Sequence, residues 1–497
     1  MMVRVSGLAS GMDIDEIVKS MMQAERVPLD KLTQKKQYSE WQRDDYRSVN
    51  TALSELDTLI RDGVGKQSSF IKKTVTISNQ NAIGIKNINS TTDFAGTIEV
   101  QNLAVAATMK NHTSLSLDPK AKVLAEGEAE KDIYIQAIDK NGELGEKKKI
   151  TIAAEDTLDS LISKINSNTE VTAFYDKQSG QMSFTAKNTG DIVSNAEIIL
   201  TGDFFTETLK MDADNDKAKE KSNGTSGINA TLTYNGLEIT RSSNVFNLNG
   251  AEFTLKDKTD GPVTFSSKPD VDTILDTVTQ FVNKYNEIIK KVQDKTSETK
   301  YRSYTPLTTE QKKAMTEDEV KLWEEKAKSG TLKNDSTLKS LLTTMRSSLY
   351  TSVDGVTGNN NLSKLGITTT KNYLEGGKLT IDEDNLRKAI SEDPNAIYNL
   401  FMKEGNGVDK SSQGLARRLR TDIQSSMKVI TEKAGKAGYV NNNFTIGKSI
   451  NGLDTRISAF EAKLIKLETR YYNQFTAMEK AISKANSQSS SLSQYFS

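Results

Sequence analysis

The stretch INGLDTRISAFEAKLIKLETRYYNQFTAMEKAISKA, residues 450–485, decides the fold of one end of this 497-residue chain. Its apolar and aromatic residues recur at spacings of three and four, and most positions between them are charged or polar. The stripe, in which every residue but Gln474 is apolar or aromatic, consists of Ile450, Leu453, Ile457, Phe460, Leu464, Leu467, Tyr471, Gln474, Met478, Ala481 and Ala485. Such a narrow stripe predicts a long helix that packs on a partner.

The length of this helix indicates what kind of partner can pack against it. A helix of roughly 36 residues would extend about 54 Å at 1.5 Å per residue. Because one small domain does not cover that length, we expect the tail to pack against another long helix or another subunit. The alternative is an exposed helix that lies on its own domain.

The composition narrows the class of protein. Lysine plus arginine and aspartate plus glutamate number 66 each, so there is no bulk basic field to attract nucleic acid or an anionic membrane. The purely apolar runs are short, as at Ile198–Leu200, and predict no membrane insertion. The N-terminus lacks the apolar region of a cleaved signal peptide. The length suggests about three domains.

The chain has little material for catalysis. It contains no cysteine, which excludes disulfides, thiolate metal sites and cysteine nucleophiles. His112 is the only histidine, so a multi-histidine metal site is excluded. A Ser-His-Asp relay could be built on this one histidine alone. We expect His112 to be a solvated residue, and we expect no catalytic residue, no metal and no cofactor.

Two partial motifs fall short of a ligand site. Gly447–Ser449 resembles the end of a phosphate-binding loop, but the place of its first glycine is taken by Asn442. Asp212, Asp214 and Asp216 imitate the start of a calcium loop that then lacks its glycine and its final glutamate. A solvated acidic loop is favoured. The residues by themselves indicate a noncatalytic, oligomeric structural protein.

The N-terminal region is expected to be helical as well. Asp13, with Glu16 three residues later, has the spacing of a capping box. We expect Pro28 to end this first helix and a second helix to run from about Leu29 to Ile60. The apolar face of the first helix is formed by Ile14, Ile17, Val18, Met21 and Met22.

In the middle of the chain the spacing of apolar residues changes from the helical repeat to strict alternation. From about Lys73 to Ser267, apolar and polar residues alternate in the manner of strands, which predicts a β-rich region long enough for two lobes. Thr157–Asn166 is the exception, with helical spacing and Asp156 as its expected cap. The polar run Asp212–Gly227 is the expected boundary between the lobes.

The remaining segments are expected to be mainly helical, with a short hairpin around Gly376–Gly377. The expected helices cover residues 270–291, 308–328, 336–350, 382 onward and 415–433. The fold class is therefore α+β and multidomain, with helical ends around a β-rich centre. We expect the two ends to pair, because pairing buries both apolar stripes at roughly 25 cal/mol per Å².

Several blocks of sequence resemble the flagellar hook-associated protein 2 family, the filament caps of bacterial flagella. The first is SGLASGMDIDEIVKSMMQAERVPLDKL at residues 6–32. Others are FVNKYNEIIKKV at 281–292, LGITTT at 365–370, GKLTIDEDNLRKAI at 377–390 and QFTAMEKAISKANSQSSSLSQYF at 474–496. Residues 157–190 resemble a repeat module shared by flagellin and hook-associated proteins.

The resemblance implies a structural, non-enzymatic role. A member of this family would form a homo-oligomeric ring of four to six subunits, with a pentamer favoured, at the distal tip of the flagellum. It would help exported flagellin to fold and insert, and it would prevent flagellin loss. It would leave the cell through the flagellar type III route without a cleaved signal peptide, after binding a cytosolic export chaperone through its C-terminal tail.

The resemblance also implies a division into domains. Residues 1–45 and 440–497 would form the terminal coiled helices, and 46–70 with 272–439 the helical leg domain. One β-rich head lobe would comprise 71–115 and 228–271. The second lobe, 116–227, would be inserted into the first.

The candidate contact residues for oligomer, filament or chaperone follow the two terminal stripes. They are Ile14, Ile17, Met21, Ile457, Phe460, Leu464, Leu467, Tyr471, Phe475, Met478 and Ile482. Packing of the two terminal helices on each other is equally compatible with these positions. The polar Gln474 breaks the stripe after Tyr471, which suggests a tail that exchanges partners.

Two other functions stay open at this point. The β-rich lobes would suit a tip adhesin that binds mucus or a host surface. A hydrolase would need an acid–base pair that no segment of the sequence indicates.

Overall fold

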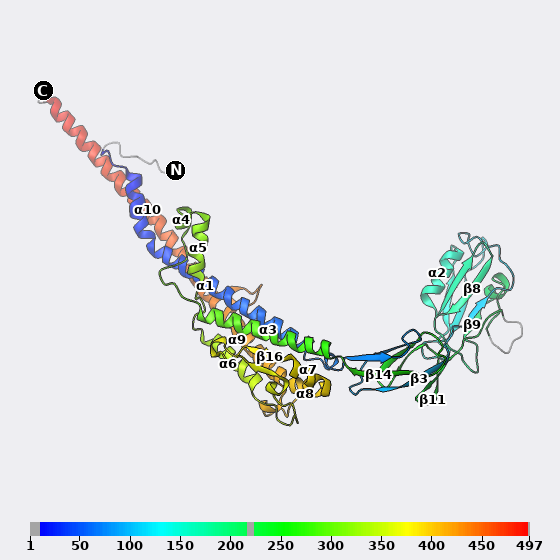
Figure 1. Ribbon diagram of the computed structural model, residues 1–497. Coiled ribbons are helices and arrows are strands. Elements are labelled where there is room, and N and C mark those ends of the chain that lie inside the picture. Colours follow the sequence, from blue (N-terminus) through cyan, green and yellow to red (C-terminus); the bar gives the residue numbers. More distant parts are fainter. Residues whose placement is uncertain (1–9, 216–222, 496–497) are drawn as a thin grey trace. The chain divides into compact units, whose positions relative to one another are not determined.

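The computed structural model describes residues 10–215 and 223–495, and the chain divides into two compact units (Figure 1). The helical unit comprises residues 1–70 and 272–497, and the β unit comprises residues 71–271. Long helices from both ends of the chain and a central β-rich region confirm the expected α+β fold class.

The helical unit is built on long helices with apolar faces. Its larger helices are α1 (Ile14–Asp62), α3 (Val271–Ser297), α6 (Ser336–Tyr350), α9 (Leu415–Ala434) and α10 (Thr445–Tyr495). Its smaller elements are α4 (Thr309–Lys313), α5 (Glu317–Lys328), the 3₁₀ helix η3 (Leu362–Leu365), β15 (Ile367–Thr369), β16 (Leu379–Ile381), α7 (Glu383–Glu392) and α8 (Pro394–Met402). The core-facing stripe of α3 is buried at helical spacing, as at Ile274, Val278 and Phe281.

Helix α1 does not end at Pro28, so the expected break there is wrong. A single helix runs from Ile14 to Asp62 with Pro28 inside it. Proline removes one backbone hydrogen bond and crowds the preceding turn. Contacts with α10 lie on both sides of this position, at Val18 and at Lys36, and they hold the helix continuous.

The segment expected as one helix over 308–328 is two helices. Thr308 forms a capping box with Gln311 at the start of α4, and Thr316 forms a second one with Glu319 at the start of α5. Each box satisfies backbone N–H groups that a continuous helix would bond to preceding carbonyls. The second cap therefore separates the two helices.

The first lobe of the β unit is an antiparallel pair of sheets. A five-stranded sheet has the order β1 (Lys73–Ile77), β14 (Val263–Pro269), β3 (Ala95–Asn102), β10 (Ala230–Tyr234) and β11 (Leu237–Arg241). A three-stranded sheet has the order β12 (Val245–Leu248), β13 (Ala251–Leu255) and β2 (Ile83–Asn87). Phe253 and Phe265, one from each sheet, meet edge to face in the core between them.

The second lobe lies between β3 and β10 in the chain. Its two sheets are β4 (Thr108–Lys110), β8 (Gln181–Ala186) and β7 (Val171–Asp176), and β6 (Lys148–Ile152), β5 (Lys131–Ala137) and β9 (Ile198–Thr201). Ala107 and Met109 belong to the core of this lobe, so it begins before the expected residue 116. The expected boundary at Asp212–Gly227 lies partly outside the described residues, as does Asp216.

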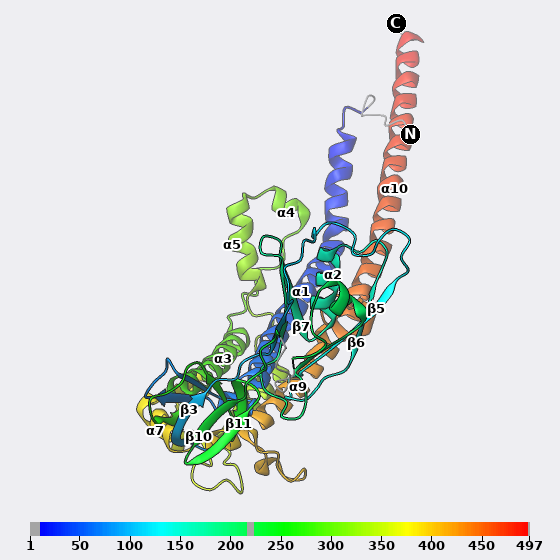
Figure 2. The same cartoon turned by 90° about the vertical axis from the view of Figure 1, so that its right-hand side faces the viewer.

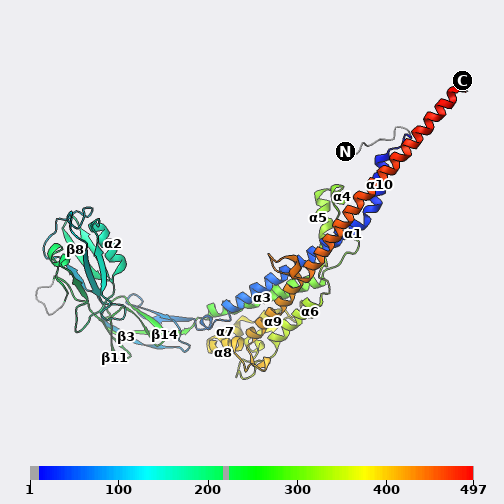
Figure 3. The same ribbon diagram turned by 180° about the vertical axis from the view of Figure 1, so that it is seen from behind.

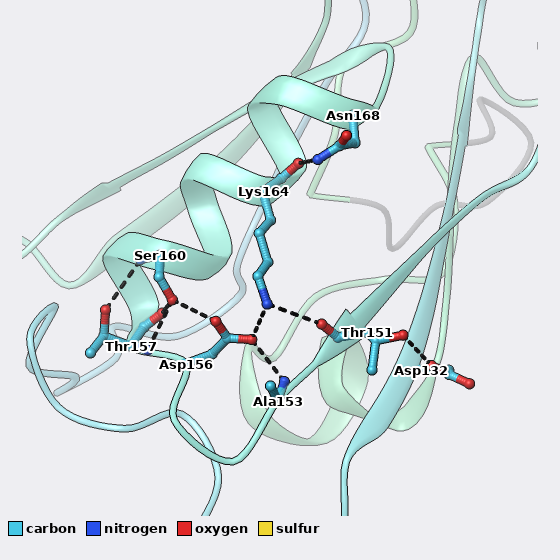
Figure 4. Close-up of polar contacts among 8 residues, drawn as sticks. All are labelled: Asp132, Thr151, Ala153, Asp156, Thr157, Ser160, Lys164 and Asn168. Carbon is cyan, nitrogen blue, oxygen red and sulfur yellow. Dashed lines mark hydrogen bonds and ion pairs between the residues drawn. The ribbon is translucent and has the colours of Figure 1, made fainter.

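Helix α2 (Leu158–Asn168) packs in the second lobe, and its cap differs from the expected one (Figure 4). Thr157 is the N-cap and shares a capping box with Ser160. Asp156 instead accepts hydrogen bonds from the backbone N–H of Ala153 and the hydroxyl of Ser160, and it pairs with Lys164. These contacts tie the first turns of α2 to the end of β6.

His112 is exposed, as expected, but it is not without a partner. Its Nε2 lies 2.8 Å from Oδ1 of Asp212, whose other carboxylate oxygen accepts a hydrogen bond from the backbone N–H of Asn223. Asp212 is thus engaged within the lobe, which supports the solvated-loop interpretation over a calcium loop.

Candidate interaction surface on the paired terminal helices

Helices α1 and α10 lie side by side and run antiparallel (Figures 1 and 3). Lys36 Nζ is 2.6 Å from a carboxylate oxygen of Asp454. Earlier in α1, Asp15 accepts a hydrogen bond of 2.8 Å from the hydroxyl of Tyr472. Because the contact positions fall along α1 as they rise along α10, the two chain ends pair head to tail.

An apolar cluster, called here the terminal seam, joins the two helices. Ile14, Val18 and Met22 of α1 and Leu464 of α10 are its buried members. Its partly buried members are Leu29, Phe460, Leu467, Tyr471, Tyr472 and Phe475. Burial of this cluster is an apolar gain from the pairing of α1 with α10.

The structure brings most of the α10 candidates together. Phe460, Leu464, Leu467, Tyr471 and Phe475 all belong to the terminal seam. The other three α10 candidates, at positions 457, 478 and 482, are half-buried and lie outside this cluster. Whether any of them contacts an oligomer partner, a filament or a chaperone stays a prediction.

The expected face of α1 is only partly the one that packs on α10. Ile14 is buried in the terminal seam, but Ile17 is half-buried and Met21 is exposed. Val18 and Met22 occupy the seam instead. They follow Ile14 at intervals of four residues, and this spacing was the signal in the sequence that identifies them. Ile17 and Met21 remain candidates for contacts outside the chain.

The stripe of α10 does not break at Gln474. Gln474 is exposed, and the seam moves by one position to Tyr472 and Phe475. Beyond it, Glu479 is buried and accepts a hydrogen bond from the hydroxyl of Ser10. The partner exchange inferred from the broken register at Gln474, Phe475 and Ile482 stays a prediction, and of these three residues Phe475 packs in the terminal seam.

The end of α10 has no such cover. It runs past the beginning of α1 (Figure 2), and every side chain from 483 to 493 is exposed. Its residues are mainly Ser, Asn, Gln, Lys and Ala, with Leu492 as an exposed apolar residue. This segment is therefore a mainly polar stretch of helix with solvent-exposed side chains.

A groove of about 470 Å³ borders the terminal seam where α4 approaches the helix pair. Arg26 of α1 lies 3.2 Å from Glu310 of α4. Partial burial and the charge of Glu310 raise the pKa of Asp30 above its usual value, and Arg26 opposes that rise. These groups are charged contacts of a helix surface and include no nucleophile–base pair.

Two further kinds of site were sought among the described residues: metal-binding clusters and membrane-spanning helices. Within 10–215 and 223–495, no three acidic or histidine side chains gather as a metal site would require. None of the helices in the described part of the chain is both long and apolar enough to cross a membrane.

Comparisons with known proteins link this arrangement to one family. The family model described as flagellar hook-associated protein 2 N-terminus matches residues 10–107, and the C-terminus model matches 227–487. Flagellar hook-associated protein 2 of Halalkalibacterium halodurans is 33% identical over 99% of this chain and 100% of its own length. The chain belongs to the flagellar hook-associated protein 2 family.

Other relatives agree with this assignment. Flagellar hook-associated protein 2 of Escherichia coli is 26% identical over 99% of this chain and 97% of its own. The model described as flagellin hook IN motif matches residues 132–188, within the second lobe. The resemblance indicated by the sequence blocks is thereby confirmed.

One solved structure shares the fold. The crystal structure of the flagellar cap protein FliD D1-D2-D3 domains from Escherichia coli has a TM-score of 0.58 and 22% identity. It covers 82% of this chain and is itself covered over 99%. The two chains thus share this fold at low sequence identity.

Proposed function

We propose that this protein is the structural cap at the distal end of a bacterial flagellar filament. The observation that carries the proposal is the family match over both terminal regions, together with a relative aligned along the whole chain. A solved structure that shares this fold is that of a flagellar cap protein. The family is one of structural flagellar components and is not known for enzymes.

The cap is proposed to be a homo-oligomeric ring of four to six copies, with five favoured. Apolar side chains left in water on the helix pair support self-association, because Val27 and Ile465 are exposed and Ile465 is 65% accessible. In this arrangement the terminal helices reach the filament, the helical unit forms the leg, and the two β lobes form the head plate.

Sedimentation velocity of the full-length protein tests the ring. We expect one discrete oligomer to form with rising concentration, and Ile465→Ser to shift the equilibrium toward monomer. A substitution at the exposed but polar Lys466 is the matched control and should leave the equilibrium unchanged. A strict monomer at every concentration would contradict the proposal.

The cap is further proposed to fold and insert flagellin subunits and to prevent their loss. Deletion of the gene in its own flagellated host should abolish filaments and release flagellin into the medium. The wild-type gene should restore filaments and swimming. Normal filaments on the deletion strain, with no released flagellin, would reject a cap role.

The uncovered end of α10 is proposed to bind a cytosolic chaperone before export through the flagellar type III route. Ile482, Met478 and Phe475 supply apolar groups where the cover by α1 comes to an end. Truncation after Ala481 should reduce the secreted amount of this protein while its cytosolic level is held equal. Unchanged secretion would show that the end of α10 has no part in export.

None of the comparisons supports the alternative of a tip adhesin. The two β lobes therefore carry no proposed ligand for mucus or a host surface.

A further inference from the structure

A pocket of about 180 Å³ lies in the helical unit between α3, α6 and the hairpin β15–β16. Tyr285 of α3 and Arg346 of α6 stand on its wall. The other lining residues are Leu349, Tyr350, Asn361, Leu362, Ser363, Ile367, Thr368, Thr369, Gly377 and Leu379. A cavity near 150 Å³ accommodates benzene, so the pocket has room for a small ring or a short side chain.

Arg346 is the one charged residue among the described residues that line the pocket. In the part of the chain that the structure describes, no carboxylate pairs with its guanidinium. Its contact is with the ring of Tyr350, whose centroid lies 5.5 Å from Cζ. A guanidinium offers five donors in a planar fork that suits a carboxylate. The pocket therefore presents a solvent-exposed guanidinium that no carboxylate of the described residues pairs with.

The Arg346 side chain is held in place on two sides. The hydroxyl of Tyr350 lies 2.7 Å from Oγ1 of Thr369, which fixes the ring beneath the guanidinium. On the other side is Gly377, with a φ of +92°. A Cβ at Gly377 would come within 3.2 Å of Cδ of Arg346, so a larger residue there would displace the arginine. This support lowers the entropy that Arg346 would lose on binding.

Tyr285 adds a second polar group without a partner. Its side chain is only 1% exposed, and its hydroxyl has no hydrogen-bond partner among the described residues. Burial raises the pKa of Tyr285, which the nearby charge of Arg346 opposes, so the hydroxyl remains protonated and a donor at neutral pH. Because Tyr285 lines the pocket and its hydroxyl is not one of the fully enclosed polar atoms, the hydroxyl is available to donate to a ligand there.

Much of the remaining wall is apolar, and Asn361, Ser363, Thr368 and Thr369 add polar groups to it. Leu349, Leu362, Ile367 and Leu379 are all buried and face the same space. A ligand that satisfied Arg346 and Tyr285 would thus place the rest of its atoms against hydrocarbon. A bare inorganic anion would leave these walls unused.

We propose that this pocket binds a carboxylate carried on a small apolar body, with Arg346 as its ion-pair partner and Tyr285 as a hydrogen-bond donor. The carboxylate has two possible sources: a free small molecule, or an acidic side chain of a second copy of this chain. The inference concerns a site outside the terminal seam and does not depend on the cap role.

Benzoate is a suitable probe, and isothermal titration of the full-length protein is the measurement. We expect saturable binding to the wild type, with benzamide, the neutral isostere, binding more weakly. Arg346→Gln should weaken benzoate binding by about tenfold or more, because it removes a charge-assisted contact. Tyr285→Phe, which deletes only the hydroxyl, should weaken it to a smaller extent.

Lys339→Gln is the matched control, since Lys339 lies on the same helix outside the pocket and loses the same charge. It should bind benzoate like the wild type. Arg346 is exposed, so its variant should keep the wild-type circular dichroism and melting temperature. Absence of saturable binding, or equal binding by Arg346→Gln and the wild type, would overturn the proposal.

A second measurement separates the two sources of the carboxylate. Sedimentation velocity is repeated with saturating benzoate. If benzoate dissociates assemblies of the wild type but not those of Arg346→Gln, the natural carboxylate belongs to a second copy. If benzoate binds and assembly is unchanged, the pocket serves a free small carboxylate.

Discussion

Met21 and Met22 are neighbours in α1 and yet have different surroundings. Met22 is 8% exposed within the terminal seam, whereas Met21 is 37% exposed. A rotation of 100° per residue separates their side chains, so the position of the partner helix decides which one is buried. At the scale of a residue, the direction in which a side chain leaves α1 therefore decides whether it is buried against α10.

This difference predicts unequal effects of the same substitution. Met22→Ala should lower the free energy of unfolding of the helical unit by about 2 kcal/mol, because it leaves a cavity in the terminal seam. Met21→Ala, its matched control, should stay within about 0.5 kcal/mol of the wild type. Urea unfolding followed at 222 nm measures both. Equal losses would mean that α10 packs on a different face of α1.

Asp156 makes a pH-dependent contribution at the same scale. It is 7% exposed. Burial opposes its charged form, but hydrogen bonds from Lys164, Ala153 and Ser160 prevail and hold its pKa below the usual value. A lowered folded-state pKa gives stability that is complete above the unfolded value of about 3.9 and is lost as the pH falls through the folded value.

Asp156→Asn should therefore destabilise the β unit by about 1–3 kcal/mol at pH 7. The difference from the wild type should shrink as the pH falls below about 4, where the wild-type carboxylate becomes protonated as well. Calorimetry between pH 3 and pH 7 measures it. Asp132→Asn, at an exposed carboxylate paired with Lys149, is the control and should have a smaller effect. A pH-independent difference would contradict the role of the charge.

At the scale of an element, α1 shows how packing overrides a local signal. Pro28 is exposed and lies between the contacts that Met22 and Lys36 make with α10. The helix tolerates the lost hydrogen bond because pairing on both sides keeps the two segments in line. The same reasoning explains α4 and α5, where strong caps at Thr308 and Thr316 prevail in a segment with few buried residues.

Pro28→Ala should accordingly stabilise the helical unit, by up to about 3 kcal/mol, because it restores a backbone donor and removes a steric conflict. The melting temperature, followed by circular dichroism at 222 nm, should rise. Lys31→Ala, at an exposed position three residues on, is the control and should change little. A decrease in stability on Pro28→Ala would instead show that the path of the chain at Pro28 is needed for pairing.

At the scale of the whole molecule, the chain forms two units with separate cores. The β unit is an insertion that leaves the helical unit after Phe70 and returns to it at Asp272. Its lobes hold their own apolar clusters, so it does not depend on the helices for burial. The helical unit is closed by segments from the two ends of the chain.

Residues 71–271 should therefore fold alone. We expect the isolated fragment to keep its β-type circular dichroism and to melt within a few degrees of one of two calorimetric transitions of the full-length protein. A variant in which a short flexible linker replaces residues 71–271 should keep the second transition unchanged. A single cooperative transition that the fragment lacks would show that the two units unfold together.

The sequence by itself determined the long helix of residues 450–485, the β-rich middle and the absence of cysteine. These features follow from local periodicity, caps and composition, which can be recognised without knowing the tertiary contacts of a segment. Only the tertiary structure decided that Met22 rather than Met21 is buried, that α1 passes through Pro28, and that Ala107 belongs to the second lobe. It also brought Tyr285 to Arg346 in one pocket. Each of these outcomes depends on contacts between segments far apart in the chain. The free energy of those contacts exceeds the local conformational preference of any single segment.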